Sequence, residues 1–502
     1  MGSREGTRAT RIAAALWGGL ILATDLLPPR VRYGYVHRWT RAAFSRPLRS
    51  LAALPADPAD AGHGDPADPA DAGHGVPAGS ADAARPTPAP DAVRCLLVAD
   101  GLDVGGIGTV IEMLALGLAE HGVHPVVLCP EDGARAARLR AAGIEVLLAA
   151  DTAAAHEAIR RARPDVIQLH SAPPPLERAA LDSGRPLIPV MHNTEIHFTR
   201  ARWARFAALM ARSAQAVAVS ETVSAFHRRR IGDGTPTTVI PNGSPAVRTP
   251  SPAQRRRARS ALSDVVGTEI GEDVVFVCLA RYDAQKNTAG LVAAFTAAIE
   301  HGAAPVRLVW AGDPSDAAEV RRADAVRRCS PAADRIHLLG NSDAGALLAA
   351  ADAFVLDSFF EGWPMAATEA SAIGLPLVLS DVGGARELVA RDVARSVLVP
   401  NATGPADLVS DARVRAARWR SAAQTNAATL GAAVSAVTAT VLAERSGASP
   451  HSTEGPDRGG VQAMRAAHAA LIRGAARHAE RLDDGAGSGR TTTGPRRQGG
   501  DG

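Results

Sequence analysis

Lysine is almost absent from this chain. Of the 55 basic residues a single one is a lysine, Lys286, and all the others are arginines. A bias of this kind usually reflects a GC-rich coding sequence, in which surface lysines have drifted to arginine. A position that still carries lysine is therefore a candidate for a role that needs an ammonium rather than a guanidinium group.

Aromatic residues and excess charge are also scarce. Aromatics make up 4% of the 502 residues and hydrophobic residues 46%, so the core must be built mainly from alanine, valine and leucine. The formal net charge of +3 gives no indication of a nucleic-acid partner, because such proteins usually show a concentrated basic face. The length is sufficient for two domains with extensions.

Cysteine is rare, and no CxxC pair occurs. Cys95, Cys129 and Cys278 lie within or at the end of apolar runs, and the fourth cysteine is Cys329. We interpret them as buried, reduced thiols, which fits a protein of the cytoplasm.

No apolar run in the N-terminal extension, residues 1–54, is long enough to span a bilayer. The run at 12–23 has twelve residues, and no clear signal-peptide cleavage site follows it. In the stretch 30–49 arginines alternate with aromatic residues. This extension either lies on an anionic membrane surface, as a peripheral contact on the inner face of the cell membrane, or is a loosely packed terminus.

Two further regions have the composition of disordered chain. Residues 55–91 are rich in Pro, Ala, Asp and Gly and repeat the octapeptide DPADAGHG, which predicts a disordered linker. Residues 446–502 are rich in Gly, Ser, Pro and Arg and predict a mostly disordered tail, with one weak helix at about 460–482.

The rest of the chain alternates short β-branched runs with alanine-rich stretches of helical length. This pattern predicts an α/β fold with two tandem Rossmann-like, doubly wound domains at 92–246 and 247–411, followed by helix at 412–445. The near-continuous apolar strands predict parallel sheets covered on both faces. Ligands are expected in a cleft facing the carboxyl ends of both sheets.

The first candidate site feature is the glycine pair Gly105 and Gly106, which follows the first predicted strand and precedes a helix. Glycines in this position let backbone N–H groups and the helix N-terminus approach an anion. The alternative is a glycine turn with a purely structural role.

The second feature is a pair of cations after the first strand of the second domain, in the run ARYDAQKN. Arg281 and Lys286 lie five residues apart at the carboxyl end of that strand and suit a diphosphate group. The alternative is two solvated loop cations, but the single lysine at this position favours a ligand.

The third feature is a pair of carboxylates in the run SFFEGWPMAATEASAIGLP. Glu361 is predicted in the loop after a strand, and Glu369 one to two turns into the next helix. Carboxylates accept hydrogen bonds from vicinal hydroxyls, so sugar and ribose are natural ligands. A general acid and base pair, as in glycoside hydrolysis, and two structural glutamates remain alternatives.

Histidines follow two strands of the first domain. His192 ends a predicted strand facing the cleft, His197 is a weaker neighbour, and His170 closes another strand. A lone histidine is more often structural than functional, and the position at the strand end favours function for His192.

These motifs, in this order, resemble the retaining glycosyltransferases of family 4, which have the GT-B fold. The resemblance covers about residues 93–445 and includes the glycine loop, the runs VMHN, VIPNG and ARYDAQKN, and the long signature that begins FVLDSFFEGWPMAATEA. It implies transfer of a hexose-type sugar from a UDP- or GDP-sugar to an acceptor, with retention and without a metal or other cofactor. The acceptor would be a sugar, a lipid-linked molecule or a small molecule, in cell-envelope polysaccharide, glycolipid or glycoconjugate synthesis.

The resemblance also implies roles for individual residues. Arg281 and Lys286 match the pair that holds the donor diphosphate, and Gly105 and Gly106 match the loop that contacts the diphosphate or the acceptor side. The E-x7-E pair would contact the donor sugar through Glu361 and the ribose through Glu369. His192 matches the histidine near the transferred sugar. In this family the last helix often packs back on the first domain, which suits 412–445.

Two positions depart from the family pattern. Asp357 stands where a proline usually precedes the serine of the signature, and Asn287 stands where a glycine usually follows the lysine. Neither change removes a charged contact. Two alternative functions remain, a nucleotide-sugar-binding GT-B protein with another activity, such as an epimerase, and a non-catalytic protein. A pyridoxal-phosphate phosphorylase is excluded because its Schiff-base lysine would have to be Lys286.

Overall fold

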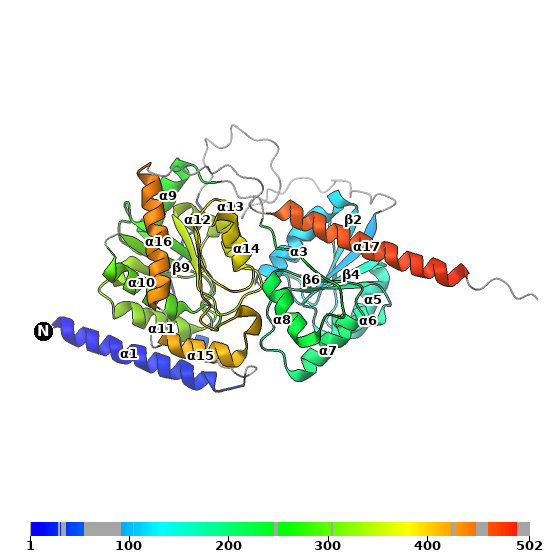
Figure 1. The fold of residues 1–502 in the computed structure, drawn as a ribbon, viewed down its shortest axis with the longest axis horizontal. Helices are drawn as coiled ribbons and strands as arrows, with labels where there is room; N and C mark the ends of the chain where they lie inside the picture. Colours follow the sequence, from blue (N-terminus) through cyan, green and yellow to red (C-terminus); the bar gives the residue numbers. More distant parts are fainter. Residues whose placement is uncertain are drawn as a thin grey trace, which may run out of the picture.

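The chain forms two α/β domains that lie side by side, with helices from both termini packed on their outer faces (Figure 1). A computed structural model describes residues 2–28, 31, 37–54, 92–103, 105–244, 249–302, 305–422, 427–447 and 460–488. The two domains confirm the predicted fold class. The proposed linker 55–91 and the proposed domain boundary after residue 246 lie outside the described residues.

The first domain is a sheet of seven parallel strands in the order β3-β2-β1-β4-β5-β6-β7. Its strands are β1 (Val93–Ala99), β2 (Val123–Cys129), β3 (Glu145–Leu148), β4 (Val166–His170), β5 (Leu187–Met191), β6 (Ala216–Ala218) and β7 (Thr237–Val239). Its helices are α3 (Gly105–Gly117), η4 (Leu118–His121), α4 (Ala134–Ala141), α5 (Thr152–Ala162), α6 (Pro174–Asp182), α7 (Arg200–Ala211) and α8 (Glu221–Ile231).

The second domain has six parallel strands in the order β10-β9-β8-β11-β12-β13. Its strands are β8 (Val274–Leu279), β9 (Val306–Ala311), β10 (Ile336–Leu339), β11 (Ala353–Leu356), β12 (Leu377–Ser380) and β13 (Val397–Val399). Its helices are α9 (Pro252–Val266), α10 (Thr288–His301), α11 (Ala317–Arg328), η5 (Ala333–Arg335), α12 (Ala344–Ala350), α13 (Met365–Ala372), α14 (Ala385–Val389), η6 (Ala390–Asp392) and η7 (Ala406–Leu408).

Both sheets are covered on their two faces, as the apolar strands predict. Every residue of β4, β5, β9 and β11 is buried. The three cysteines placed in apolar runs, Cys95, Cys129 and Cys278, are buried, and all four cysteines of the chain are free. Burial raises the pKa of the Cys129 thiol to about 11 and that of Cys95 to about 12, so these thiols are packing residues.

The two helices after the second domain pack differently, and the prediction for 412–445 was wrong for the longer of them. Helix α16 (Ala427–Arg445) lies along α10 of the second domain. Val414 and Ala417 of α15 (Asp411–Ala422), in contrast, join a buried apolar cluster with Phe226 of α8 in the first domain. The buried stripe of α16 is Leu430, Val434, Val437 and Val441, at helical spacing. The apolar surface of α10 supplies a nearer partner for this stripe than the first domain does.

The C-terminal tail supplies the helix that crosses to the first domain. Helix α17 (Val461–Ser488) lies across the first sheet, against α3, η4, β1, β2 and β4 (Figure 1). Met464 and Ile472 are buried in this contact. The helix expected at about 460–482 within the tail is present as α17 and extends to Ser488. It buries one apolar face, which the weak sequence signal did not indicate.

The described part of the N-terminal extension is packed rather than loose. Helices α1 (Gly2–Asp25) and α2 (His37–Phe44) lie against α11 of the second domain. Asp25 forms a buried ion pair with Arg418 of α15, and Arg418 also pairs with Glu319 of α11. Residues 48–51 then run past the end of β10, where Gly340 donates to the carbonyl of Arg49 at 2.8 Å.

One described helix is long and apolar enough to cross a membrane, α16. Its buried stripe against α10 identifies it as a core helix of the second domain.

Candidate functional site

The predicted site residues follow the central strands of the two sheets. The strand order reverses between β1 and β4 in the first domain and between β8 and β11 in the second. Ligands of open α/β sheets bind outside the carboxyl ends of the strands at such a reversal. Arg281 and Lys286 follow β8 and Glu361 follows β11, so the second-domain candidates lie at this position.

Lys286 and Glu361 form an ion pair across the loops after β8 and β11. Both side chains are largely buried. Ser358 Oγ donates to Glu361 Oε1 at 2.6 Å, and Gln285 Nε2 donates to Glu361 Oε2 at 3.1 Å. These contacts fix the carboxylate of Glu361 and leave the ammonium of Lys286 beside it.

Arg281 points elsewhere in this structure. Its side chain is half exposed and pairs with Asp283 at 3.1 Å. It therefore lies in the same loop as Lys286 without contacting Glu361, and it can still turn toward a bound anion because its partner is in its own loop.

The two departures from the family pattern contact each other. Asn287 has φ of 47°, in the left-handed region that favours glycine, and its Nδ2 donates to Asp357 Oδ2 at 2.6 Å. Both residues are buried, and burial raises the pKa of the Asp357 carboxyl to about 6. This hydrogen bond joins the loop of Lys286 to the strand end that leads to Glu361. Sequence analysis identified Asn287 and Asp357 as departures from the family pattern, but it did not predict the hydrogen bond between them.

Glu369 lies in the second turn of α13, as predicted, and it is half-buried. Burial raises the pKa of its carboxyl group to about 7, and no nearby cation opposes this shift. A carboxyl group in this state can take up ligand hydroxyls as hydrogen-bond partners.

The two domains meet at the signature loop. A side chain at Gly362 would lie 1.6 Å from the carbonyl oxygen of His192, so only glycine permits this approach. Ser220 Oγ also donates to the carbonyl of Gly362 at 3.2 Å. Glu361 and His192, from different domains, are therefore neighbours through the backbone of Gly362.

The glycine loop also faces the second domain. Gly105 starts α3 with φ of 81°, which requires glycine, and a side chain at Gly106 would lie 2.9 Å from Met365 Cγ at the start of α13. The loop after β1 and the helix of Glu369 thus approach each other across the domain interface.

His192 belongs to a buried hydrogen-bonded chain that the sequence did not reveal. Its Nε2 lies 2.8 Å from Nδ1 of His170, and Nε2 of His170 lies 3.0 Å from Oε1 of Gln168. On the other side, Nε2 of Gln168 lies 3.0 Å from Nδ1 of His468 in α17. Only the i, i+2 spacing of Gln168 and His170 on β4 was readable beforehand.

These hydrogen bonds determine which ring nitrogen of each histidine carries the proton. Burial lowers the pKa of His192 to about 3 and that of His468 to about 4, and it lowers the pKa of His170 as well, so all three are neutral at pH 7. Because the Gln168 oxygen accepts from Nε2 of His170, Nδ1 of His170 must accept from Nε2 of His192. Nδ1 of His192 then carries a lone pair.

His197 does not join this group. It is half exposed and lies near Asp411 at 3.9 Å, at the edge of the domain interface. A residue not singled out from the sequence, Glu195, lies nearer the strand end. Burial and the neighbouring charge of Asp100 raise the pKa of its carboxyl to about 7 despite Arg202.

Among the residues that the structure describes, no group of three or more His, Cys, Asp or Glu side chains could hold a metal ion.

Comparison with known sequences and structures agrees with this arrangement. The sequence model described as Glycosyltransferase Family 4 matches residues 104–246, and the one described as Glycosyl transferases group 1 matches residues 273–413. Together they cover more than half of the chain. No curated protein sequence matches it.

Solved structures show the same fold at low sequence identity. HepE from Anabaena, in complex with UDP and glucose, has a TM-score of 0.54 and 17% identity, over 76% of this chain and 100% of its own. A glycosyltransferase from Rickettsia africae also has a TM-score of 0.54 and 17% identity, over 70% of this chain and 99% of its own.

The paired sheets, the residues gathered at the domain interface and the two matched regions agree, and the chain belongs to the GT-B glycosyltransferases of group 1, family 4.

Proposed function

We propose that this protein transfers a hexose-type sugar from a UDP- or GDP-sugar to an acceptor, with retention of the anomeric configuration. The observation that carries the proposal is the contact between the domains. Lys286 pairs with Glu361, and the next residue, Gly362, lies on the backbone of His192. A donor bound there would meet a cation, a carboxylate and an imidazole from both domains.

The second domain supplies the donor side. Lys286 and Arg281 are the cations for the diphosphate, and Gly105 and Gly106 offer backbone N–H groups from the opposite domain. Glu369 would accept hydrogen bonds from the ribose hydroxyls. The UDP and glucose found in HepE support a UDP-sugar as the first donor to test.

The roles of the side chains during transfer follow from their positions at the domain contact. Nδ1 of His192 is free to accept a hydroxyl of the transferred sugar, and Glu361 can accept another. As the bond between the sugar and the phosphate breaks, Lys286 and Arg281 stabilise the negative charge on the departing diphosphate. The new bond forms on the same face, and the acceptor proton passes to the departing phosphate oxygen.

The acceptor side lies in the first domain. A sugar, a lipid-linked molecule or a small molecule is the proposed acceptor class, in the synthesis of cell-envelope polysaccharide, glycolipid or glycoconjugate. We propose a cytoplasmic protein, with peripheral contact to the inner face of the cell membrane. Buried free thiols at Cys95, Cys129 and Cys278 are consistent with a reducing compartment.

Alanine substitutions at the donor site test this proposal. Lys286→Ala removes the buried ammonium and Glu369→Ala the half-buried carboxyl, and each should lower the turnover of a UDP- or GDP-sugar about 100-fold or more. The assay of the unmodified chain is repeated with EDTA, and activity should be unchanged. The reason is that the proposal assigns neutralisation of the diphosphate to Arg281 and Lys286 rather than to a metal ion.

The control variant is Arg178→Ala, on the exposed face of α6. It should turn over the donor like the unmodified chain. Full activity of both site variants, or loss of all activity in EDTA, would contradict the assignment.

A further inference from the structure

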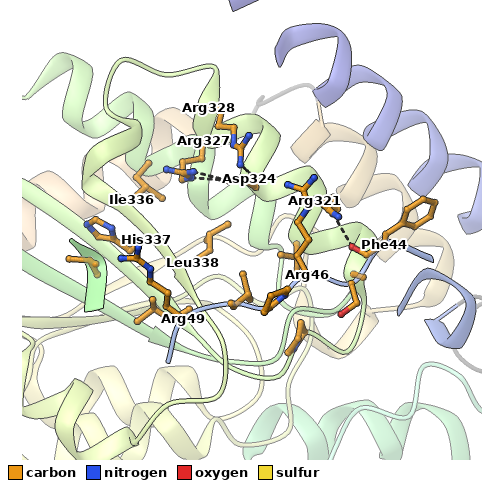
Figure 2. Close-up of a pocket in the computed structure, with 18 of the residues that line it drawn as sticks. Phe44, Arg46, Arg49, Arg321, Asp324, Arg327, Arg328, Ile336, His337 and Leu338 are labelled. Atoms are coloured by element: carbon orange, nitrogen blue, oxygen red, sulfur yellow. Dashed lines mark hydrogen bonds and ion pairs between the residues drawn. The ribbon is translucent and has the colours of Figure 1, made fainter. Parts of the chain in front are cut away.

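A cavity on the outer side of the second domain is formed with the help of the N-terminal extension. It has a volume of about 370 Å³ and lies between residues 44–49, the helix α11, the end of α9 and the edge strand β10 (Figure 2). It is separate from the loops that carry Lys286 and Glu361, and the proposed sugar transfer does not use it.

Positive charge dominates the lining of this cavity. Five arginines line it, and the carboxylate of Asp324 is the single acidic group among the lining residues. Both Arg327 and Arg328 pair with Asp324 at 2.8 Å. Burial lowers the pKa of His337 to about 4, so this lining histidine adds no charge at pH 7.

Three of the guanidinium groups have no acidic partner among the described residues. Arg49 donates to the carbonyl of Val265 at 2.7 Å. Arg321 donates to the carbonyl of Phe44 at 2.9 Å, and Arg46 makes no hydrogen bond or ion pair within the described chain. Figure 2 shows these two side chains close together above the cavity. Burial and the charge of Arg46 lower the pKa of Arg321, and the charge of Asp324 offsets this shift only in part.

Apolar side chains make up much of the remaining lining. They are Leu48 of the extension and Val265, Val320, Ile336 and Leu338 of the second domain. A lining that combines guanidinium groups with hydrocarbon suits an amphiphilic molecule that carries a phosphate group.

The N-terminal extension, which supplies part of this lining, carries many exposed apolar side chains. More than half of the exposed large hydrophobic side chains in the described chain lie before residue 45: Ile12, Leu16, Leu26, Leu27, Val31 and Trp39. Ile12 and Leu16 are one turn apart on α1, and both α1 and α2 pack on α11, which also carries Arg321 and Arg328. Exposed apolar side chains next to unpaired cations are the features of a surface that meets an anionic bilayer.

We propose that this cavity binds the phosphate headgroup of an anionic phospholipid, and that α1 and α2 lie on the same bilayer. The phosphate would sit between Arg46 and Arg321, with the glycerol and upper acyl carbons against the apolar side chains of the lining. This proposal goes beyond the sugar transfer and does not depend on it.

Vesicle binding of the full chain tests the proposal. The chain should bind vesicles of equal parts phosphatidylglycerol and phosphatidylcholine and bind phosphatidylcholine vesicles far more weakly. Arg46→Gln should lower the partition coefficient about fivefold, and Arg46→Gln with Arg321→Gln by a further factor of about five. Arg46 has no partner to lose in the part of the chain that the structure describes, so its single variant tests the site without breaking an observed contact.

The control is the double variant Arg160→Gln with Arg178→Gln. It removes the same amount of positive charge, from two exposed arginines of the first domain. Equal weakening by the control variant, equal binding to both kinds of vesicle, or unchanged binding by the Arg46 variants would each overturn the proposal. Melting curves recorded with glycerol 3-phosphate test whether the ligand is a soluble phosphate ester rather than a lipid headgroup. An increase in Tm that depends on Arg46, without vesicle binding, would replace the lipid by a free phosphate ester.

Discussion

Glu369 combines an unusual environment with a proposed role in binding ribose. Its carboxyl group is half-buried, and burial alone raises its pKa to about 7. The group therefore changes charge near neutral pH, whereas an exposed glutamate is fully ionised there. A carboxylate that accepts hydrogen bonds from two hydroxyls is stabilised in its charged form.

Donor binding should consequently depend on pH around 7. Since the ligand favours the ionised form of Glu369, the affinity for UDP-glucose should rise with pH and level off above about 7. Below that value each unit of pH should cost up to about tenfold in Kd. UDP-glucose is the suitable probe because its diphosphate does not titrate in this range.

Titration calorimetry at several pH values measures the effect. Glu369→Gln should bind more weakly and show a flat profile. Glu195→Gln, which removes the other glutamate with a pKa near 7, should keep the slope. A slope that survives in Glu369→Gln would assign the pH dependence to another group.

The pair Asn287 and Asp357 offers a second prediction at the scale of residues. Asn287→Gly fits the left-handed backbone but removes the donor to the buried carboxyl of Asp357. The free energy of unfolding should fall by about 1–2 kcal/mol. In the Asp357→Ala background the same change should cost nothing, because no buried acceptor is left unsatisfied.

Denaturant unfolding of the four proteins gives this double-mutant cycle. Additive effects would mean that the hydrogen bond contributes no coupling between the two loops.

At the scale of elements, α17 reaches the site through one side chain. His468 accepts from Gln168, and this bond fixes the amide orientation that orders His170 and His192. The helix lies outside both matched regions of the family, which end at residue 413. We regard His468 as a positioning residue that acts through the chain of hydrogen bonds.

Two variants of similar size separate this role from packing. His468→Leu removes the acceptor and should lower kcat about tenfold with a smaller change in KM. His468→Asn keeps an acceptor near the position of Nδ1 and should restore most of kcat. Nitrogen chemical shifts of His192 should show protonated Nε2 in the Asn variant and a mixture of tautomers in the Leu variant. Equal loss in both variants, with unchanged His192 shifts, would leave His468 a core residue only.

At the scale of the whole molecule, the site exists only where the two domains meet. The backbone of Gly362 lies against that of His192, and the added methyl group of Gly362→Ala would collide with the His192 backbone. The collision lies in a loop between the domains and outside both sheets, so the Tm should change little. Transfer should fall about 100-fold because the sugar and the reacting groups are no longer held together.

Gly234→Ala is the matched control, since a side chain there would meet no atom within 4 Å. It should keep full activity. Small-angle scattering should show a larger radius of gyration for Gly362→Ala alone, and unchanged scattering together with unchanged activity would contradict the proposed closed arrangement.

Local patterns along the chain were sufficient to predict the two α/β domains and the loops that carry the candidate residues. Strand runs such as those of β8 and β11 are apolar throughout, and this local pattern specifies parallel, buried strands. The position of Lys286, Glu361 and Glu369 relative to these strands followed from the same pattern, because it depends only on neighbours in the chain.

Which distant segments meet could not be predicted from such local patterns. The apolar stripe of α16 fits more than one surface in principle, and packing placed it on α10, while α17 covers the first domain. The contacts of Asn287 with Asp357 and of His468 with Gln168 join residues far apart in sequence. Such pairs depend on the three-dimensional approach of whole elements, and no periodicity within a segment encodes them.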